Sequence, residues 1–180
     1  MEQSDHDGLI ISYIGNGKGK TTAALGIVLR AVGHGQKALM IQFIKGKWFY
    51  GEMISSKKLE PNFELIVAGK GFVGILDDIY DFDIHKKAAL NTINIAKEKI
   101  ISQKYDVVVL DEINYALKLN LITVDQILEL IDHKPKKTTI VLTGNYLAKE
   151  IEKHSDIITQ MTEIKHPYNN GIKAKQGIDY

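Results

Sequence analysis

The sequence predicts a three-layer α/β fold with a mostly parallel central sheet. Short apolar runs without polar alternation are typical of parallel strands that are covered on both faces. These runs alternate along the chain with segments of helical periodicity. The alternation continues over most of the 180 residues, which favours a single domain at residues 1–180 with an irregular tail from about residue 165.

Each expected element rests on a local pattern. The expected strands are the apolar runs at residues 9–14, 38–44, 63–67, 106–110, 138–143 and 157–162. The expected helices lie at residues 21–32, 84–102 and 124–131. Gly33 and Gly35 follow the first of them as stop signals. The long second helix carries an apolar stripe, made of Ala89, Ile93, Ala96 and Ile100.

Composition argues against several classes of function. The net charge is +1 with a single arginine, so a nucleic-acid partner is not expected. No apolar run reaches the length of a membrane span, and the polar, acidic start of the chain is unlike a signal peptide. The chain has no cysteine, which excludes disulfides and cysteine-bound metal. A cytoplasmic location is therefore expected.

The strongest motif is a glycine- and lysine-rich turn between the first expected strand and the first expected helix. Its glycines let successive backbone N–H groups face one concavity, the helix N-terminus adds partial positive charge, and Lys20 adds a full one. The Thr21 hydroxyl is then placed to hold Mg²⁺. The candidate nucleotide-binding residues are Gly15, Asn16, Gly17, Lys18, Gly19, Lys20, Thr21 and Thr22.

This phosphate loop is shorter than the common pattern. Four residues usually separate its two glycines, which would place the first glycine at position 14. Ile14 stands there instead. The usual nucleotide pose of a P-loop ATPase is therefore not expected.

An acidic pair follows a buried strand further along the chain. Asp111 and Glu112 come directly after the run Val-Val-Val-Leu. P-loop folds bring an acid to the metal on such a strand, which we expect to lie beside the loop strand. Many parallel strands end in an acid, so a purely structural role stays open.

Arg30 has two interpretations. The planar guanidinium group of arginine is well suited to bind phosphates. Arg30, however, lies about 13 Å along the expected helix from Thr21, at ~1.5 Å per residue. Near the helix C-terminus it would also stabilise the helix dipole. The six histidines show no metal-ligand spacing.

With these motifs in place, the chain resembles the P-loop family of ATP:corrinoid (cob(I)alamin) adenosyltransferases. The loop at residues 15–22 has that family's short form, and further matches follow in order as far as residue 180. They are Ala-Ala-Leu-Gly at 23–26, Arg-Ala-Val-Gly-His-Gly at 30–35, Gln-Phe-Ile-Lys-Gly at 42–46, Gly-Phe at 71–72, Leu-Asp-Glu at 110–112, Thr-Gly at 143–144 and Gly-Ile-Lys-Ala-Lys-Gln-Gly-Ile-Asp-Tyr at 171–180.

The resemblance implies a RecA-like P-loop fold and transfer of the 5′-deoxyadenosyl group of ATP to the Co(I) of a reduced corrinoid, with release of triphosphate. It also implies a homodimer, a flavoprotein reductant, and ATP lying reversed in the loop. By this likeness Lys20 and the loop amides hold the triphosphate, and Thr21 and Glu112 hold Mg²⁺ or Mn²⁺. Phe72 faces the corrinoid near cobalt, and Asp111 is a further metal candidate from its position at the strand end.

The chain departs from the family pattern at three places. Gly74 stands where the family usually has tryptophan, and Asn145 stands where it usually has arginine. Fewer residues precede the first expected strand than in the family. Efficient turnover is therefore less firmly implied than the fold.

Three other functions remain open from the sequence. A generic P-loop ATPase or small-molecule kinase would need the same two features, a phosphate loop and a strand that ends in an acid, although the short loop argues against it. A RecA-like nucleic-acid module conflicts with the charge balance. A corrinoid-binding protein without catalysis is compatible with Gly74 and Asn145, and Phe72 could be a packing anchor instead of a corrinoid contact.

Overall fold

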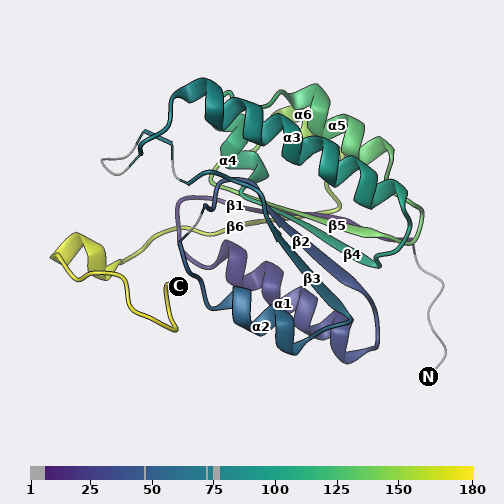
Figure 1. Ribbon diagram of the computed structural model, residues 1–180, viewed down its shortest axis with the longest axis horizontal. Coiled ribbons are helices and arrows are strands. Elements are labelled where there is room, and N and C mark those ends of the chain that lie inside the picture. Colours follow the sequence, from purple (N-terminus) through teal and green to yellow (C-terminus); the bar gives the residue numbers. More distant parts are fainter. Residues whose placement is uncertain (1–6, 47, 72, 75–77) are drawn as a thin grey trace.

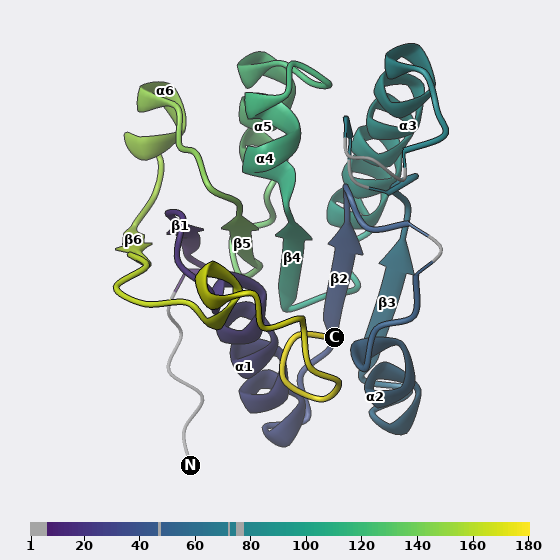
Figure 2. The ribbon, with the colours of Figure 1, turned by 90° about the vertical axis from the view of Figure 1, so that its left-hand side faces the viewer.

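A computed structural model describes residues 7–46, 48–71, 73–74 and 78–180, and its arrangement confirms the predicted fold class (Figure 1). Within these residues one sheet of six parallel strands has the order β3-β2-β4-β5-β1-β6. Figure 2 shows the strands side by side in this order. The strands are β1 (Ile10–Ile14), β2 (Ala38–Gln42), β3 (Phe63–Val67), β4 (Val107–Asp111), β5 (Thr139–Thr143) and β6 (Ile157–Gln160).

Helices cover both faces of the sheet (Figure 1). One face carries α1 (Lys20–Gly33) and α2 (Glu52–Lys58). The other carries α3 (Phe82–Ile101), α4 (Ile113–Lys118), α5 (Val124–Asp132) and α6 (Lys149–Glu152). The tail contains a short 3₁₀ helix, η1 (Pro167–Asn170). The sequence patterns predicted α1, α3 and α5 and missed the three shorter α-helices.

The buried face of α3 matches its predicted stripe. Ala89, Ile93, Ala96 and Ile100 are all buried and belong to the larger apolar cluster, between the sheet and the helices of that face. A second cluster lies on the α1 side and includes Ala24, Val28 and Met40. The central strands β2 and β4 are buried along their whole length, which explains why their sequences show no polar alternation.

Sheet order corrects one sequence-based expectation. The acid-bearing strand β4 does not lie beside the loop strand β1, because β5 pairs with both of them. The carboxyl ends of β1, β5 and β4 therefore meet at one edge of the sheet, with the end of β5 in the middle. In the part of the chain that the structure describes, no helix is long and apolar enough to cross a membrane.

Candidate functional site

The phosphate loop connects β1 directly to α1, as its motif predicts. Gly15 and Gly19 have φ angles of +99° and +111°, a region that side chains other than glycine rarely adopt. A Cβ on Gly15 would lie 2.2 Å from the carbonyl oxygen of Met161, and one on Gly17 would lie 2.8 Å from the carbonyl carbon of Thr162. Glycine is thus required at positions 15 and 17 because the segment after β6 packs against the loop, whereas at position 19 the positive φ favours it.

Lys20 turns back over this loop. Its Nζ donates a hydrogen bond to the carbonyl oxygen of Gly17 at 2.8 Å. The N–H of Gly17 donates to the carbonyl of Met161 at 2.9 Å, so this loop amide already has a partner within the protein. The ammonium of Lys20 therefore lies on the loop itself, close to where bound phosphates would be held.

The Asp111 carboxylate accepts hydrogen bonds from two threonines, of which Thr21 belongs to the phosphate loop. Thr21 Oγ1 donates to Asp111 Oδ1 at 2.9 Å, and Thr143 Oγ1 donates to the same oxygen at 2.8 Å. Thr143 also accepts a hydrogen bond from the backbone N–H of Glu112 at 2.8 Å. Thr143 is at the end of β5, the strand between β1 and β4, and its hydroxyl joins the Asp111 carboxylate to the backbone N–H of Glu112.

Glu112 sits in an unusual backbone and electrostatic environment. Its φ of +62° is left-handed, at the junction between β4 and α4. Burial, followed by the charge of Asp111, raises the pKa of Glu112 to about 7, although Lys20 and Lys45 act in the opposite direction. Two adjacent carboxylates here therefore repel each other beside the Thr21 hydroxyl.

The donor chemistry of these residues fits a hard divalent cation. A carboxylate pair and a hydroxyl are oxygen ligands of the kind that Mg²⁺ prefers, and a cation between them would relieve the repulsion that raises the pKa of Glu112. Among the described residues no group of three or more acidic, histidine or cysteine side chains could hold a metal. Mg²⁺ commonly binds one or two carboxylates together with substrate phosphates.

A second network extends from Asp111 toward α2, and the sequence patterns missed it. Lys45 Nζ contacts Glu52 Oε1 and lies 4.0 Å from Asp111 Oδ2. Gln42 Nε2 donates to Glu52 Oε1 at 3.0 Å and to Asp111 Oδ2 at 3.4 Å. Burial alone would raise the pKa of Glu52, but the hydrogen bond from Lys45 and its charge lower it overall. The Lys45 ammonium also lies 4.4 Å from the centre of the Tyr50 ring.

The comparisons with known proteins decide the family. A family model described as ATP:corrinoid adenosyltransferase BtuR/CobO/CobP matches residues 6–180. The chain belongs to this family. The corrinoid adenosyltransferase of Escherichia coli K12 is 34% identical to this family member, over 99% of the chain and 89% of the relative. The corrinoid adenosyltransferase of Sinorhizobium sp. is 36% identical over 99% of this chain and 83% of the relative. The corrinoid adenosyltransferase CobA of Salmonella typhimurium LT2 is 33% identical over 99% of this chain and 89% of the relative.

A solved structure has the same fold as this adenosyltransferase family member. The crystal structure of a KaiC-like protein from Pyrococcus horikoshii matches with a TM-score of 0.52, over 88% of this chain and 75% of that one. The sequence identity is 14%, so the likeness concerns the fold alone.

The position of Phe72, the predicted corrinoid contact of this family, lies outside the described residues. The residues around it are anchored on both sides. The N–H of Gly71 donates to the carbonyl of Ile44 at 3.0 Å, and the N–H of Gly74 donates to Asp78 Oδ2 at 2.8 Å. Gly74 has a φ of +73°, so a tryptophan at this position would be strained in this backbone.

Asp78 is in turn held by the start of α3. His85 Nε2 lies 2.9 Å from Asp78 Oδ1, and the N–H of Tyr80 donates to the same oxygen at 3.1 Å. The hydrogen bonds from Gly74 and then from His85 hold the pKa of Asp78 down at about 2, so the carboxylate accepts and the imidazole N–H donates. His85 is thereby the buried partner of a loop carboxylate.

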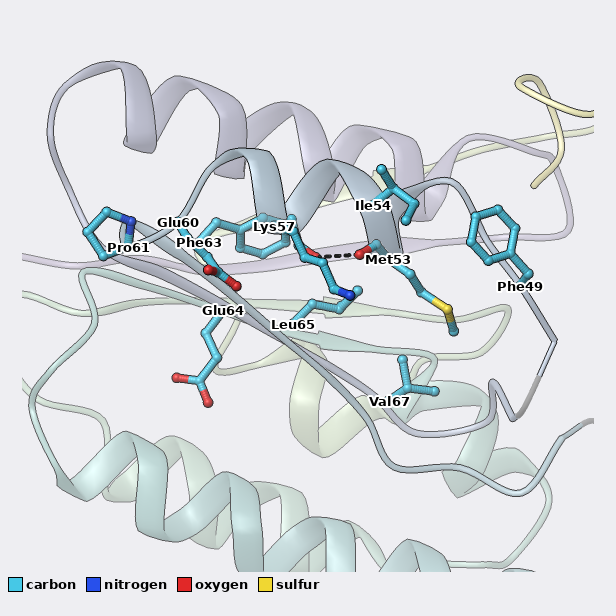
Figure 3. A pocket seen from close by; sticks show the side chains of 11 residues that line it. Phe49, Met53, Ile54, Lys57, Glu60, Pro61, Phe63, Glu64, Leu65 and Val67 are labelled. Carbon is cyan, nitrogen blue, oxygen red and sulfur yellow. Dashed lines mark hydrogen bonds between the residues drawn. The ribbon is translucent and has the colours of Figure 1, made fainter.

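Two other features lie away from the loop. Arg30 is exposed in the last turn of α1, at the opposite end of that helix from Lys20. A cavity of about 660 Å³ lies between α2 and the edge strand β3, where Figure 3 shows Met53, Leu65 and Val67 among its lining. None of the residues that line this cavity belongs to the phosphate loop.

Proposed function

We propose that this protein is an ATP:corrinoid adenosyltransferase, which transfers the 5′-deoxyadenosyl group of ATP to the Co(I) of a reduced corrinoid. The observation that carries the proposal is the family match over residues 6–180, which includes the short phosphate loop. The placement of Lys20 on that loop, and of Thr21 against Asp111, supports it.

The proposed reaction needs little acid–base chemistry. Co(I) is a strong nucleophile that attacks C5′ of the ATP ribose, so the Co–C bond forms as the C5′–O bond breaks. The electron pair of that bond leaves on the triphosphate, and cobalt donates both electrons of the new bond. No proton has to move. The protein's task is to hold C5′ in line with cobalt and to stabilise the charge of the leaving triphosphate.

The residues of the loop are assigned to the second task. Lys20 and the loop amides would bind the triphosphate, together with Lys18 at the rim of the loop. Thr21, Asp111 and Glu112 are the residues that would hold Mg²⁺, or Mn²⁺ in its place. Bound there, the ion would supply positive charge that offsets the charge of the triphosphate.

The corrinoid side is assigned to the segment around Phe72. An apolar ring beneath the corrinoid would exclude the lower axial ligand of Co(II), and the four-coordinate species is easier to reduce. The backbone N–H groups of Gly71 and Gly74, on either side of this position, donate hydrogen bonds to Ile44 and Asp78. We further propose, from the family resemblance, a homodimer, a flavoprotein reductant and a cytoplasmic location.

One experiment tests the central proposal. Purified protein is mixed anaerobically with MgATP and chemically reduced cobalamin, while the visible spectrum is recorded and free triphosphate is assayed. The expected result is the spectrum of a Co–C bond with stoichiometric triphosphate. Production of ADP and phosphate would indicate the ATPase or kinase alternative, and corrinoid binding without a Co–C bond would indicate a carrier. In a separate binding assay, retention of an oligonucleotide by the protein at low salt would indicate the nucleic-acid alternative.

A further inference from the structure

The residues Lys175–Tyr180 form a compact turn built around a carboxylate. Asp179 Oδ2 accepts the N–H of Lys175 at 2.7 Å, and the N–H of Asp179 donates back to the carbonyl of Lys175 at 2.8 Å. The N–H of Gly177 donates to the carbonyl of Tyr180 at 2.8 Å, and Gly177 takes a φ of +78°. The carboxylate of Asp179 is therefore oriented by its own turn as well as by its partner outside it.

That partner is a residue of the phosphate loop. Asp179 Oδ1 contacts Lys18 Nζ, across 161 positions of sequence. The hydrogen bond from Lys18, followed by the one from the Lys175 N–H, lowers the pKa of Asp179, so the carboxylate is ionised at neutral pH. Figure 2 shows the segment running from β6 across α1 to the neighbourhood of α2.

The turn also forms one wall of a cavity next to the loop. The cavity has a volume of about 630 Å³, and its lining includes Thr21 and Thr22 at the start of α1, together with Lys45 and Glu52. Gly177–Tyr180 supply another wall. The backbone of Tyr180 lies against the start of α2, where a Cβ on Gly51 would be 3.9 Å from its carbonyl carbon.

The segment before this turn braces the loop from another side. The carbonyl of Met161 accepts the N–H of Gly17, and the N–H of Glu163 lies 3.5 Å from Asn16 Oδ1. Residues 161–163 and the turn at 175–180 thus both contact the phosphate loop.

We propose that Asp179 is a positioning residue of the nucleotide site, which orients Lys18 and fixes the turn at 175–180 as a wall of that site. The proposal rests on the proposed function, in which Lys18 contacts the triphosphate. An ammonium has three N–H donors, so Lys18 can keep one on Asp179 while the others face phosphate oxygens. The side chains of Lys18 and Asp179 are 45% and 21% exposed, so the pair contributes little to stability and substitutions there should fold.

Two possible roles of the Asp179 charge predict opposite changes in ATP affinity when that charge is removed. A carboxylate close to a triphosphate repels it, so if Asp179 were only a neighbouring charge, its neutralisation would tighten ATP binding. If Asp179 positions Lys18 and the cavity wall, its neutralisation weakens ATP binding. The sign of the change therefore separates the two roles.

The test measures ATP affinity and turnover for Asp179→Asn, Asp179→Glu, Lys18→Ala and the double variant Lys18→Ala/Asp179→Asn. Asp179→Asn is expected to raise the Kd of MgATP by calorimetry, and the KM for ATP, about three- to tenfold. The kcat at saturating ATP and the KM for the corrinoid should stay within about twofold, and Asp179→Glu should recover part of the loss. The double variant should bind ATP no more weakly than Lys18→Ala, because the two residues act as a unit.

Glu129→Gln is the matched control, because it removes the carboxylate of another exposed lysine–carboxylate pair, that of Lys97 on α3 and Glu129 on α5. It should leave ATP affinity unchanged. Unchanged or tighter ATP binding by Asp179→Asn overturns the proposal, and so does equal loss in the control. If the wild-type protein forms no Co–C bond, the proposed function fails, while the calorimetric comparison still decides the role of Asp179. A wild-type protein that does not bind ATP overturns both.

Discussion

Thr21 Oγ1 donates a hydrogen bond to Asp111 Oδ1 at 2.9 Å, although the two residues are 90 positions apart. Thr21 lies in the first turn of α1, and Asp111 is the last residue of β4. The hydroxyl of Thr143, on the strand between β1 and β4, donates a hydrogen bond to the same Asp111 oxygen. The phosphate loop and the acidic pair therefore form one polar cluster. If this cluster holds a cation, as proposed, the cation would compete with the two hydroxyls for the Asp111 carboxylate, so metal binding and the conformation of Thr21 should be coupled.

Lys20→Ala should weaken ATP binding and nearly abolish transfer. A charge-assisted contact to phosphate is worth ~1.5–3 kcal/mol, or about a tenfold to a hundredfold loss of affinity. Arg30→Ala is the control, since Arg30 lies in the last turn of the same helix, and it should leave ATP affinity unchanged. Equilibrium binding and initial rates provide the measurement. Activity of Lys20→Ala within about twofold of wild type, a loss of only ~0.4 kcal/mol, would remove Lys20 from the site.

Glu112→Gln should raise the Mg²⁺ concentration required for half-maximal activity. Glutamine keeps the shape of the side chain but loses the negative charge that attracts a divalent cation. The measurement is a titration of initial rate against Mg²⁺ at saturating ATP. Glu129→Gln is a suitable control, because it removes a carboxylate from the exposed surface of α5. Superimposable titrations of wild type and Glu112→Gln would assign Glu112 a structural role.

The raised pKa of Glu112 should make the stability of the protein depend on pH in metal-free buffer. The pKa of Glu112 is about 7 in the folded protein against an ordinary value of 4.5. Between these values the folded state binds more protons than the unfolded state, so this residue lowers stability as pH rises through the window. Glu112→Gln should therefore raise Tm relative to wild type at pH 8 and lose that advantage near pH 4. Saturating Mg²⁺ should reduce the difference at pH 8, and a difference independent of pH would contradict the assignment.

Thr143→Val should destabilise the fold by about 1–3 kcal/mol and loosen the metal site. The substitution leaves the backbone N–H of Glu112 and the fully buried Asp111 carboxylate each without one partner. Urea unfolding gives the free energy, and the Mg²⁺ titration gives the effect on the site. Thr159→Val, on the exposed strand β6, should stay within about 0.5 kcal/mol of wild type. Equal effects of the two substitutions would show that the bridging hydroxyl is unimportant.

Phe72→Ala should impair adenosylation that starts from Co(II) and a mild reductant far more than adenosylation that starts from Co(I). The ring's proposed role is to displace the lower ligand of Co(II), which is no longer needed once cobalt is reduced. Phe49→Ala is the control, since Phe49 is 56% exposed and lines the separate cavity beside β3. Equal losses in both assays, or loss of folded protein, would assign Phe72 to packing. Gly74→Trp should shift the Co(II) rate upward only if the strain of its positive φ is accommodated.

Much of the fold could be predicted from local patterns. Apolar runs marked all six strands, and they are unbroken in β2 and β4, which are buried along their whole length, whereas β6 is exposed. The long stripe of α3 marked its buried face. The short helices α2, α4 and α6 escaped prediction because helices of seven, six and four residues contain too few turns to show a period.

Some residues of the candidate site could be predicted from the sequence, and others only from the tertiary structure. Gly15–Thr22 and the pair Asp111 and Glu112 are readable from sequence because their chemistry depends on neighbours in the chain. Thr143 and Asp179 lie in segments that resemble the family, but neither they nor Glu52 show a local pattern for these contacts, since their partners are 32, 161 and 10 positions away. Only the packing of β5 between β1 and β4, and of the turn at 175–180 onto the loop, brings these groups together. Strand order and long-range contacts depend on the free energy of the whole assembled core, which no single segment encodes.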